Sequence, residues 1–188
     1  MRLLEIVNAV KNTPRLGWVQ RGVPSSIAET IAEHIIETSV ICLDLGDLFL
    51  REYIFSEKEI KESILIALIH DLPEGVVGDL NRYVSKRIGD LKKVLEKTVI
   101  DDMNNKLIKD LFEEYINMSR VESLLAKLCD RIATYTQALR YDRLGYNTSD
   151  IIENTKAEIK NLVESICLSR ERCREIINEY IQRIESTV

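Results

Sequence analysis

The stretch ILIALIHDLPEG, residues Ile64–Gly75, joins a continuous apolar run to a polar end. The run predicts a helix that is buried on most sides, and it is far shorter than the roughly 20 residues that a membrane span needs. Pro73 stands just past the expected helix end, where it cannot continue a helix. The helix therefore places an imidazole and a carboxylate, His70 and Asp71, side by side at its end.

Composition supports an all-α fold around this stretch. The chain has 188 residues, of which 45% are hydrophobic and 30% charged, as in an ordinary globular domain. Only seven glycines and three prolines are present, so a turn-rich β protein is disfavoured and long helices are favoured. No repeat or linker divides the sequence. We therefore expect residues 1–188 to form one domain, a compact bundle of several helices.

Apolar periodicity and capping residues predict the helices. Ser56 and Glu59 have the spacing of a capping box, which opens a helix. The segment Pro14–Pro24 is expected to be a loop, and Pro73–Tyr83 to be irregular. The expected helices cover about Leu3–Lys11, Ser25–Leu45, Ser56–Asp71, Ile88–Met118, Arg120–Arg143, Asp150–Leu168 and Arg170–Ser186.

The last expected helix carries an apolar stripe that must be buried against a partner surface. Its members recur at helical spacing and are Cys173, Ile176, Ile177, Tyr180, Ile181 and Ile184. The stripe is expected to pack on the core of the same chain, and a dimer interface is the alternative.

Net charge and cysteine usage limit the function. A net charge of −5 and a pI near 5.3 disfavour a broad nucleic-acid-binding face, although a local basic pocket for a small phosphate ester remains open. The beginning of the sequence lacks the apolar core of a signal peptide. No CxxC pair occurs among the cysteines, so we expect a cytoplasmic protein with reduced, mostly buried thiols at Cys42, Cys129, Cys167 and Cys173.

The chain has two histidines, and His34 is expected to point inward. It shares a helix face with Ile27, Ile31, Thr38, Ile41 and Leu45, while the opposite face carries Glu29, Glu33 and Glu37. A core histidine that bonds to a backbone carbonyl is the simplest interpretation of His34 taken alone.

Two carboxylates are ambiguous when each is taken alone. Burial of Asp71 without a counter-charge would be costly, so it indicates either a divalent cation or a salt bridge at a helix end. Asp130 lies in a polar stripe with Lys127, Arg131 and Thr134. Periodicity alone favours a solvated Asp130 that pairs with Lys127 three residues earlier.

The order of these residues changes their interpretation. His34, the His70-Asp71 doublet and Asp130 follow the H…HD…D pattern of the HD superfamily of metal-dependent phosphohydrolases, which this sequence resembles. Four blocks are similar to those of its 5′-deoxynucleotidase-like branch. They are PRLGWVQRGV (14–23), ETIAEH (29–34), LIHDLPEGVVGDL (68–80) and AKLCDRIATYTQAL (126–139). The resemblance covers residues 14–141, and the helices expected at 150–186 lie outside it.

The resemblance implies an all-helical HD core with a metal site. It implies that His34, His70, Asp71 and Asp130 hold one divalent ion. Imidazole and carboxylate ligands suit Mn²⁺, Co²⁺, Fe²⁺, Ni²⁺ or Zn²⁺, and the sequence does not choose among these metals. A bound ion would acidify a water and polarise a phosphoryl oxygen.

The resemblance also implies substrate and catalytic roles. Glu74 would position the water or protonate the leaving oxygen, beside Asp71, and Asp79 would contact the sugar. Trp18 would stack on the sugar. Bacterial members of the branch carry Arg directly before this Trp, whereas here Gly17 stands there. The phosphate ligand is therefore expected to be Arg15, with Arg21 second, and the choice between ribose and deoxyribose stays open.

These expectations lead to one leading hypothesis and two alternatives. The leading hypothesis is a metal-dependent 5′-nucleotidase that acts on nucleoside or deoxynucleoside 5′-monophosphates, as a homodimer without nucleic-acid or membrane partners. A phosphodiesterase or nucleoside triphosphatase of the same superfamily is one alternative. The other is a non-catalytic helical interaction protein with a structural metal.

Overall fold

The computed structural model describes residues 3–168 and 170–188, apart from the side chains of residues 82 and 86. Within those ranges the regular structure is helical, and the extended pairing is an isolated bridge between Pro14 and Thr30. The helices follow the order α1 (Leu3–Asn12), α2 (Leu16–Val19), α3 (Ile31–Arg51), α4 (Glu57–Ile69), α5 (Glu74–Val77), α6 (Arg82–Ile88), α7 (Asp90–Asp102), α8 (Lys106–Asn117), α9 (Val121–Arg143), α10 (Ser149–Cys167) and α11 (Glu171–Thr187). The fold is all-α, as expected.

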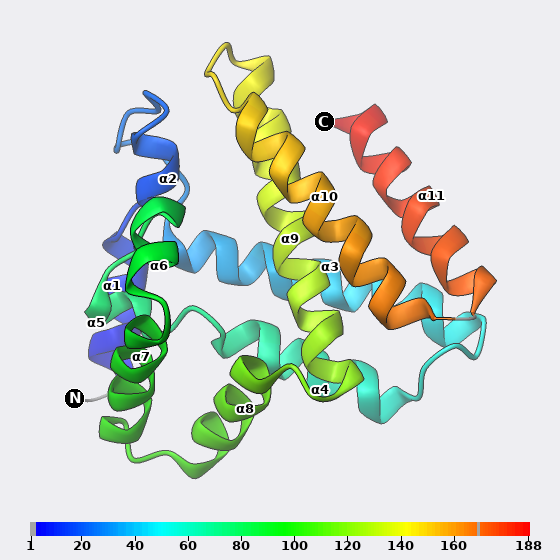
Figure 1. Ribbon diagram of the computed structural model, residues 1–188, viewed down its shortest axis with the longest axis horizontal. Helices are drawn as coiled ribbons and strands as arrows, with labels where there is room; N and C mark the ends of the chain where they lie inside the picture. Colours follow the sequence, from blue (N-terminus) through cyan, green and yellow to red (C-terminus); the bar gives the residue numbers. More distant parts are fainter. Residues whose placement is uncertain (1–2, 169) are drawn as a thin grey trace.

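Helix α9 is the central element. Figure 1 shows it crossing the middle of the molecule, with α10 in front of it and α3 behind, and it contacts α3, α4, α8, α10 and α11. Leu128, Ile132 and Ala133 are fully buried, so α9 is covered on several faces. A polar side chain in the middle of α9 therefore lies inside the protein.

Two capping boxes begin the helices that cross behind α9. Thr30 accepts a hydrogen bond from the N–H of Glu33, whose carboxylate accepts one from the N–H of Thr30. Ser56 and Glu59 repeat this arrangement at the start of α4, as predicted. Each box satisfies two groups that the first helical turn leaves without partners.

The start of α3 corrects the prediction at Ser25 and Ser26. Both serines lie in a turn in which the N–H of Ile27 donates to the carbonyl of Pro24 over 3.0 Å. The helix begins only after Thr30, so residues before it do not follow helical register. Ile27, expected on the buried face, is consequently 57% exposed.

Helices α3 and α4 approach closely at Gly46. A Cβ atom at this position would lie 2.4 Å from Cγ2 of Ile60, so only glycine permits the observed spacing. The crossing brings the end of α4 against the first turns of α3. There the ring centroids of His34 and His70 lie 5.4 Å apart.

The segment that follows the His-Asp doublet is more helical than predicted. Residues expected to be irregular form α5 and the beginning of α6. Asn81 begins α6 by accepting a hydrogen bond from the N–H of Val84 at 2.9 Å. The helix expected from Ile88 to Met118 is divided, because Gly89 adopts a φ of +50° between α6 and α7 and a turn at Asn104 separates α7 from α8.

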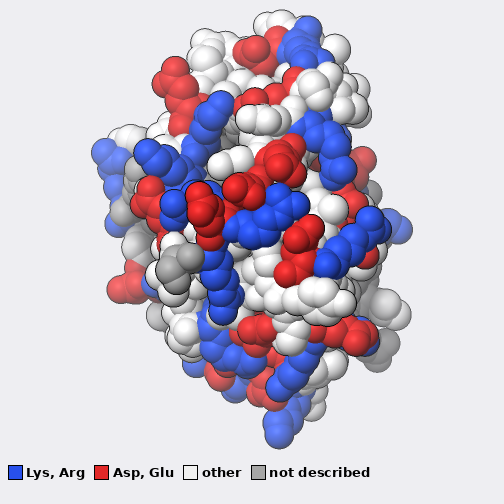
Figure 2. Space-filling model, turned by 90° about the vertical axis from the view of Figure 1, so that its right-hand side faces the viewer, with Lys and Arg blue, Asp and Glu red and all other residues white. Residues whose placement is uncertain are grey.

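The two C-terminal helices pack on the chain itself. Cys173 and Ile177 of α11 are fully buried in the cluster that contains α3, α9 and α10, which confirms the expected packing of the stripe on the core. Figure 2 looks onto this side of the molecule and shows acidic and basic side chains interleaved across it. None of the helices in the described ranges has the length and hydropathy of a membrane span.

The cysteines are buried as expected, but the prediction of reduced thiols is wrong. A disulfide joins Cys42 of α3 to Cys129 of α9, and a second joins Cys167 to Cys173 between α10 and α11. In both pairs the Cα atoms lie 5.5 Å apart, which is the usual separation in a disulfide. Helix packing creates this proximity, and 87 residues separate the members of the first pair.

Candidate active site

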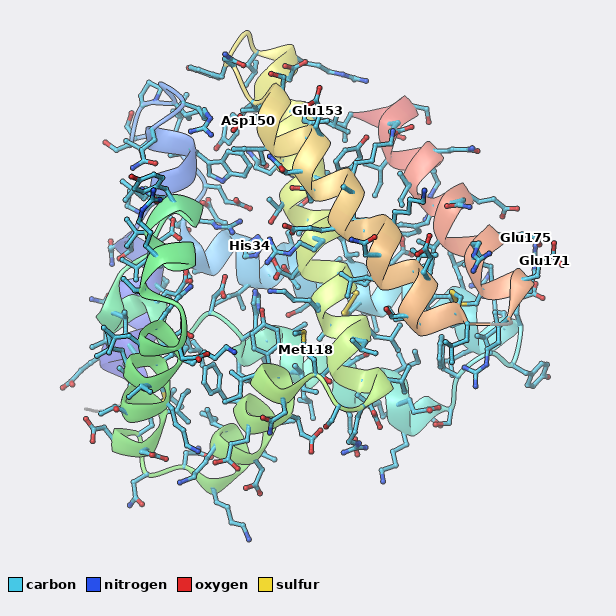
Figure 3. All side chains as sticks on the ribbon, viewed as in Figure 1. His34, Met118, Asp150, Glu153, Glu171 and Glu175 are labelled. Carbon is cyan, nitrogen blue, oxygen red and sulfur yellow. A yellow bond between two sulfur atoms is a disulfide. The ribbon has the colours of Figure 1, made fainter. Side chains whose placement is uncertain are left out.

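Three predicted ligands converge at the crossing of α3, α4 and α9. Ligand atoms of His34, His70 and Asp130 all lie within 4.8 Å of one another, and all three side chains are buried. Asp71 completes the group, with Oδ2 at 3.2 Å from Nε2 of His70 and 3.7 Å from Nε2 of His34. Figure 3 shows His34 in the interior, between the ribbons of α3 and α9.

The chemistry of this group fits a divalent cation. Nδ1 of His70 lies 2.6 Å from the carbonyl of Ala67, to which it donates, so the lone pair belongs to Nε2. Nε2 is buried and has no hydrogen-bond partner among the described residues. A buried lone pair that faces carboxylates is costly unless it is coordinated. A metal ion would satisfy Nε2 and the carboxylates of Asp71 and Asp130 together.

Asp130 divides its two oxygens between two sets of partners. Oδ1 lies 3.2 Å from Nε2 of His34, while Oδ2 accepts from Lys127 at 2.8 Å and lies 3.3 Å from Arg131. Burial acts to raise the pKa of Asp130, but the two cations hold it well below its usual range. The predicted pairing with Lys127 is confirmed. The solvated position that periodicity favoured is wrong, because Asp130 is only 3% exposed.

His34 is a neutral imidazole between a cation and an anion. Its Nδ1 lies 2.9 Å from NH1 of Arg15. Burial, reinforced by the Arg15 charge and opposed by Asp130 and Asp71, lowers the pKa of His34 to about 4. Among the described residues neither ring nitrogen bonds to a backbone carbonyl, so the simple core-histidine interpretation does not describe His34. A neutral imidazole is the form that binds metals.

Glu74 stands beside this cluster at the first position of α5. Helix α5 packs tightly on α1, where a Cβ at Gly75 would lie 2.9 Å from Cγ1 of Val10. Oε1 of Glu74 accepts a hydrogen bond from Nζ of Lys92 on α7 at 2.8 Å. Burial, with a further contribution from Asp71 and against the Lys92 ammonium, raises the pKa of Glu74 to about 8.

The predicted substrate residues surround the same pocket. Trp18 is 2% exposed and packs on the ring of Tyr141, with centroids 5.2 Å apart. Arg21 lies farther out, where its Nε donates to Oδ1 of Asp150 at 3.1 Å. Asp79 accepts a hydrogen bond from the N–H of the first residue of α2. This bond joins the loop after α5 to the N-terminal loop.

The pocket that these residues line has a volume of about 660 Å³, which suits a small organic ligand. Asp150 and Met118 both line it, and in Figure 3 they lie above and below His34. Its wall also contains four basic side chains that were not predicted to bind substrate, namely Lys92, Lys93, Lys127 and Arg131. Charge-assisted hydrogen bonds from such groups suit a phosphate.

The prediction that Glu29 lies on the polar face of a helix over Ser25–Leu45 is wrong. The residue precedes α3 and is 6% exposed, and its Oε2 accepts from Nε1 of Trp18 at 2.8 Å and from NH1 of Arg15 at 3.4 Å. The predicted helix begins more than one turn before the observed start of α3 at Ile31. Thr30 and Glu33 have the spacing of a capping box, but Ser26 and Glu29 have it too, so this spacing alone does not identify the correct start.

Comparison with known proteins agrees with this geometry. The sequence profile of the HD domain matches residues 7–167. The chain belongs to the HD-domain family. It is similar to the 5′-deoxynucleotidase HDDC2 of Dictyostelium discoideum, with 31% identity over 81% of this chain and 83% of the relative. The 5′-deoxynucleotidase HDDC2 of Danio rerio is 27% identical over 94% of this chain and 89% of its own length.

Solved structures show the same HD-domain fold. A conserved hypothetical protein from Pyrococcus furiosus superposes with a TM-score of 0.81 at 26% identity, and the match covers 98% of both chains. A protein from Pyrococcus horikoshii superposes with a TM-score of 0.77 at 22% identity, covering 97% of this chain and 96% of the other.

Metal binding to the cluster predicts a ligand-dependent gain in stability. Co²⁺ added to chelator-treated protein at about 100 times its Kd should raise the free energy of unfolding by about 2.7 kcal/mol, because it binds the folded state. Thermal unfolding with and without Co²⁺ measures the gain. Asp130→Asn should abolish it, whereas Asp142→Asn, an exposed change on the same helix, should retain it. Equal gains in the two variants would exclude Asp130 as a ligand.

Proposed function

We propose that this HD-domain protein is a metal-dependent 5′-nucleotidase that removes phosphate from nucleoside or deoxynucleoside 5′-monophosphates. The observation that carries the proposal is the convergence of His34, His70 and Asp130 at a pocket that His70 and Asp130 line together with Glu74 and Arg15. The two relatives named 5′-deoxynucleotidase HDDC2 support this substrate class.

In this proposal the metal site is formed by His34, His70, Asp71 and Asp130. Two imidazoles and two carboxylates suit one Mn²⁺, Co²⁺, Fe²⁺, Ni²⁺ or Zn²⁺ ion. When bound, such an ion supplies a water of lowered pKa and polarises a phosphoryl oxygen. Lys127 and Arg131 hold the far oxygen of Asp130 and so direct its Oδ1 toward the histidines.

The N-terminal loop would bind the substrate. Arg15 lies beside His34, so its guanidinium fork can reach a phosphate held at the cluster. Arg21 lies at the pocket rim, bonded to Asp150, and is the second candidate for the phosphate ligand. Trp18 and Asp79 also line this pocket, and an aromatic ring and a carboxylate are groups that suit contacts with a sugar.

Glu74 would act as the general acid. A carboxyl group whose pKa is raised to about 8 is largely protonated at neutral pH. As water attacks phosphorus and the bond to the 5′ oxygen breaks, Glu74 gives its proton to that oxygen, and the carboxylate then faces the Lys92 ammonium. Asp71, three residues earlier, stays ionised and stays with the metal ligands.

Activity of purified protein tests this function. With Mn²⁺ or Co²⁺, phosphate release from nucleoside 5′-monophosphates should exceed release from nucleoside triphosphates and phosphodiesters. Asp71→Asn should lower kcat/KM by about 100-fold, because it replaces an anionic carboxylate ligand with a neutral amide. Asp142→Asn is the matched control and should keep wild-type activity. A preference for diesters or triphosphates would favour the alternative enzymes, and metal binding without turnover would indicate an interaction protein.

The pH dependence of kcat tests the role of Glu74. Activity should fall as the pH rises through about 8, because the proton donor is lost. Glu74→Gln should lower kcat by about 10²- to 10⁴-fold and remove this alkaline limb. Lys92→Met should move the limb to higher pH, because the Lys92 ammonium lowers the pKa of Glu74. If the alkaline limb does not shift in Lys92→Met, the limb reports a group other than Glu74.

The assembly that we propose is a homodimer of one-domain chains. The apolar stripe of α11 packs on the core of its own chain, so the dimer interface must be formed by another surface. Helix α3 exposes Ile36, Val40 and Leu43 at helical spacing, by 61%, 55% and 58%, and the adjacent α4 exposes Leu65 and Leu68. Light scattering should give the molar mass of a dimer for the wild type and that of a monomer for Val40→Glu.

A cytoplasmic location is also a proposal, and it is supported by the nucleotide substrate class. In most organisms two disulfides would argue against a cytoplasmic location, because the reducing cytoplasm keeps thiols free. Intracellular proteins of hyperthermophiles are the exception and are disulfide-rich. Counting free thiols in freshly lysed, alkylated cells decides whether the bonds exist at that location.

A further inference from the structure

Glu29 is a buried carboxylate that no step of the proposed reaction uses. Its Oε2 accepts hydrogen bonds from Trp18 and Arg15. Its Oε1 is buried, has no hydrogen-bond partner among the described residues, and lies 3.8 Å from Nδ1 of His34. A buried anionic oxygen without a donor is costly, so its position beside a metal ligand requires an explanation.

The hydrogen bonds of His34 provide that explanation. A guanidinium can only donate, so the contact with Arg15 makes Nδ1 the acceptor nitrogen. The ring hydrogen is then on Nε2, which donates to Oδ1 of Asp130. For Nε2 to serve as a metal ligand, the hydrogen must move to Nδ1. Nδ1 then needs an acceptor, and NH1 of Arg15 can no longer stay opposite it.

We propose that Glu29 is a positioning residue that holds His34 in its metal-binding tautomer and sets the place of Arg15. Oε1 is the acceptor for the N–H of Nδ1, in the way that carboxylates commonly orient ligating histidines. Arg15, displaced from His34, keeps its contact with Oε2 and gains a free N–H for the substrate phosphate. The metal site and the phosphate ligand are thus coupled through one carboxylate.

Backbone contacts fix Glu29 for this task. Its N–H donates to the hydroxyl of Tyr141 at 2.8 Å, and its carbonyl accepts from the N–H of Arg15, also at 2.8 Å. The backbone of Glu29 is therefore fixed at both of its peptide groups, independently of the contacts that its carboxylate makes. The inference rests on the proposed metal-dependent nucleotidase, since it assigns His34 to the metal.

The test compares Zn²⁺ affinity in three untagged, chelator-treated proteins. Calorimetric titration with Zn²⁺ alone should show about 10- to 100-fold weaker binding to Glu29→Gln than to wild type. Glu153→Gln, an exposed change of the same charge on α10 outside the pocket, should bind like wild type. Equal affinity of Glu29→Gln and wild type overturns the inference. Failure of wild type to bind any divalent transition metal overturns the proposed function itself.

A second measurement needs no variant and separates positioning from general structure. The chain has two histidines, so nitrogen-15 spectra of their rings resolve each tautomer. His34 should carry its hydrogen on Nε2 in metal-free wild type and on Nδ1 with Zn²⁺ bound. If the hydrogen of His34 stays on Nε2 in the Zn²⁺ complex, Glu29 has no N–H to accept and the inference is wrong.

Discussion

The contact between Nε2 of His34 on α3 and Oδ1 of Asp130 on α9, 3.2 Å long, is the constraint on which the rest of the structure depends. Both groups are buried, and a buried charge is costly unless every polar atom around it has a partner. Lys127 therefore turns inward to the other oxygen of Asp130, and Arg15 turns inward to the other nitrogen of His34. Arg15 in turn requires Glu29.

This series of hydrogen bonds explains why the N-terminal loop around Arg15 and the helical core form one unit. Trp18 and Arg15 belong to the loop and short helix before α3, yet both bond to the carboxylate of Glu29 next to the core. Asp79 holds the other side of that loop from beyond α5. The pocket wall is thus connected to the proposed metal ligands by hydrogen bonds and not by apolar packing alone.

Sequence predicted the long helices well and the short ones poorly. The capping box at Ser56 and the long apolar pattern of α9 carry strong signals, and the structure has both elements at nearly the expected bounds. Helices α5 and α6 have four and seven residues, too few for a periodic pattern to develop. At α3 the predicted start at Ser25 and Ser26 is too early, and the observed cap is Thr30. Spacing did not separate the two starts, because Ser26 and Glu29 are three residues apart just as Thr30 and Glu33 are.

The candidate site, like the helices, could be predicted from the sequence only in part. Because the chain has two histidines, His34 and His70 were the available imidazole ligands. Asp71 was predicted with them because it directly follows His70. Contacts between distant helices could not be predicted in this way. Lys92 reaches Glu74 from α7, and Cys42 meets Cys129 across 87 residues, because tertiary packing and not local spacing decides these distances.

The disulfide between Cys42 and Cys129 has a mechanical consequence for the cluster. Cys129 is the neighbour of Asp130, and Cys42 lies eight residues, about two turns, beyond His34 on α3. The two helices that carry these groups are therefore covalently clamped close to the place where they meet. The bond restrains sliding of α3 along α9, so His34 and Asp130, the proposed metal ligands on these helices, are held near their observed spacing without an ion. Little ordering entropy is then lost when the ion binds.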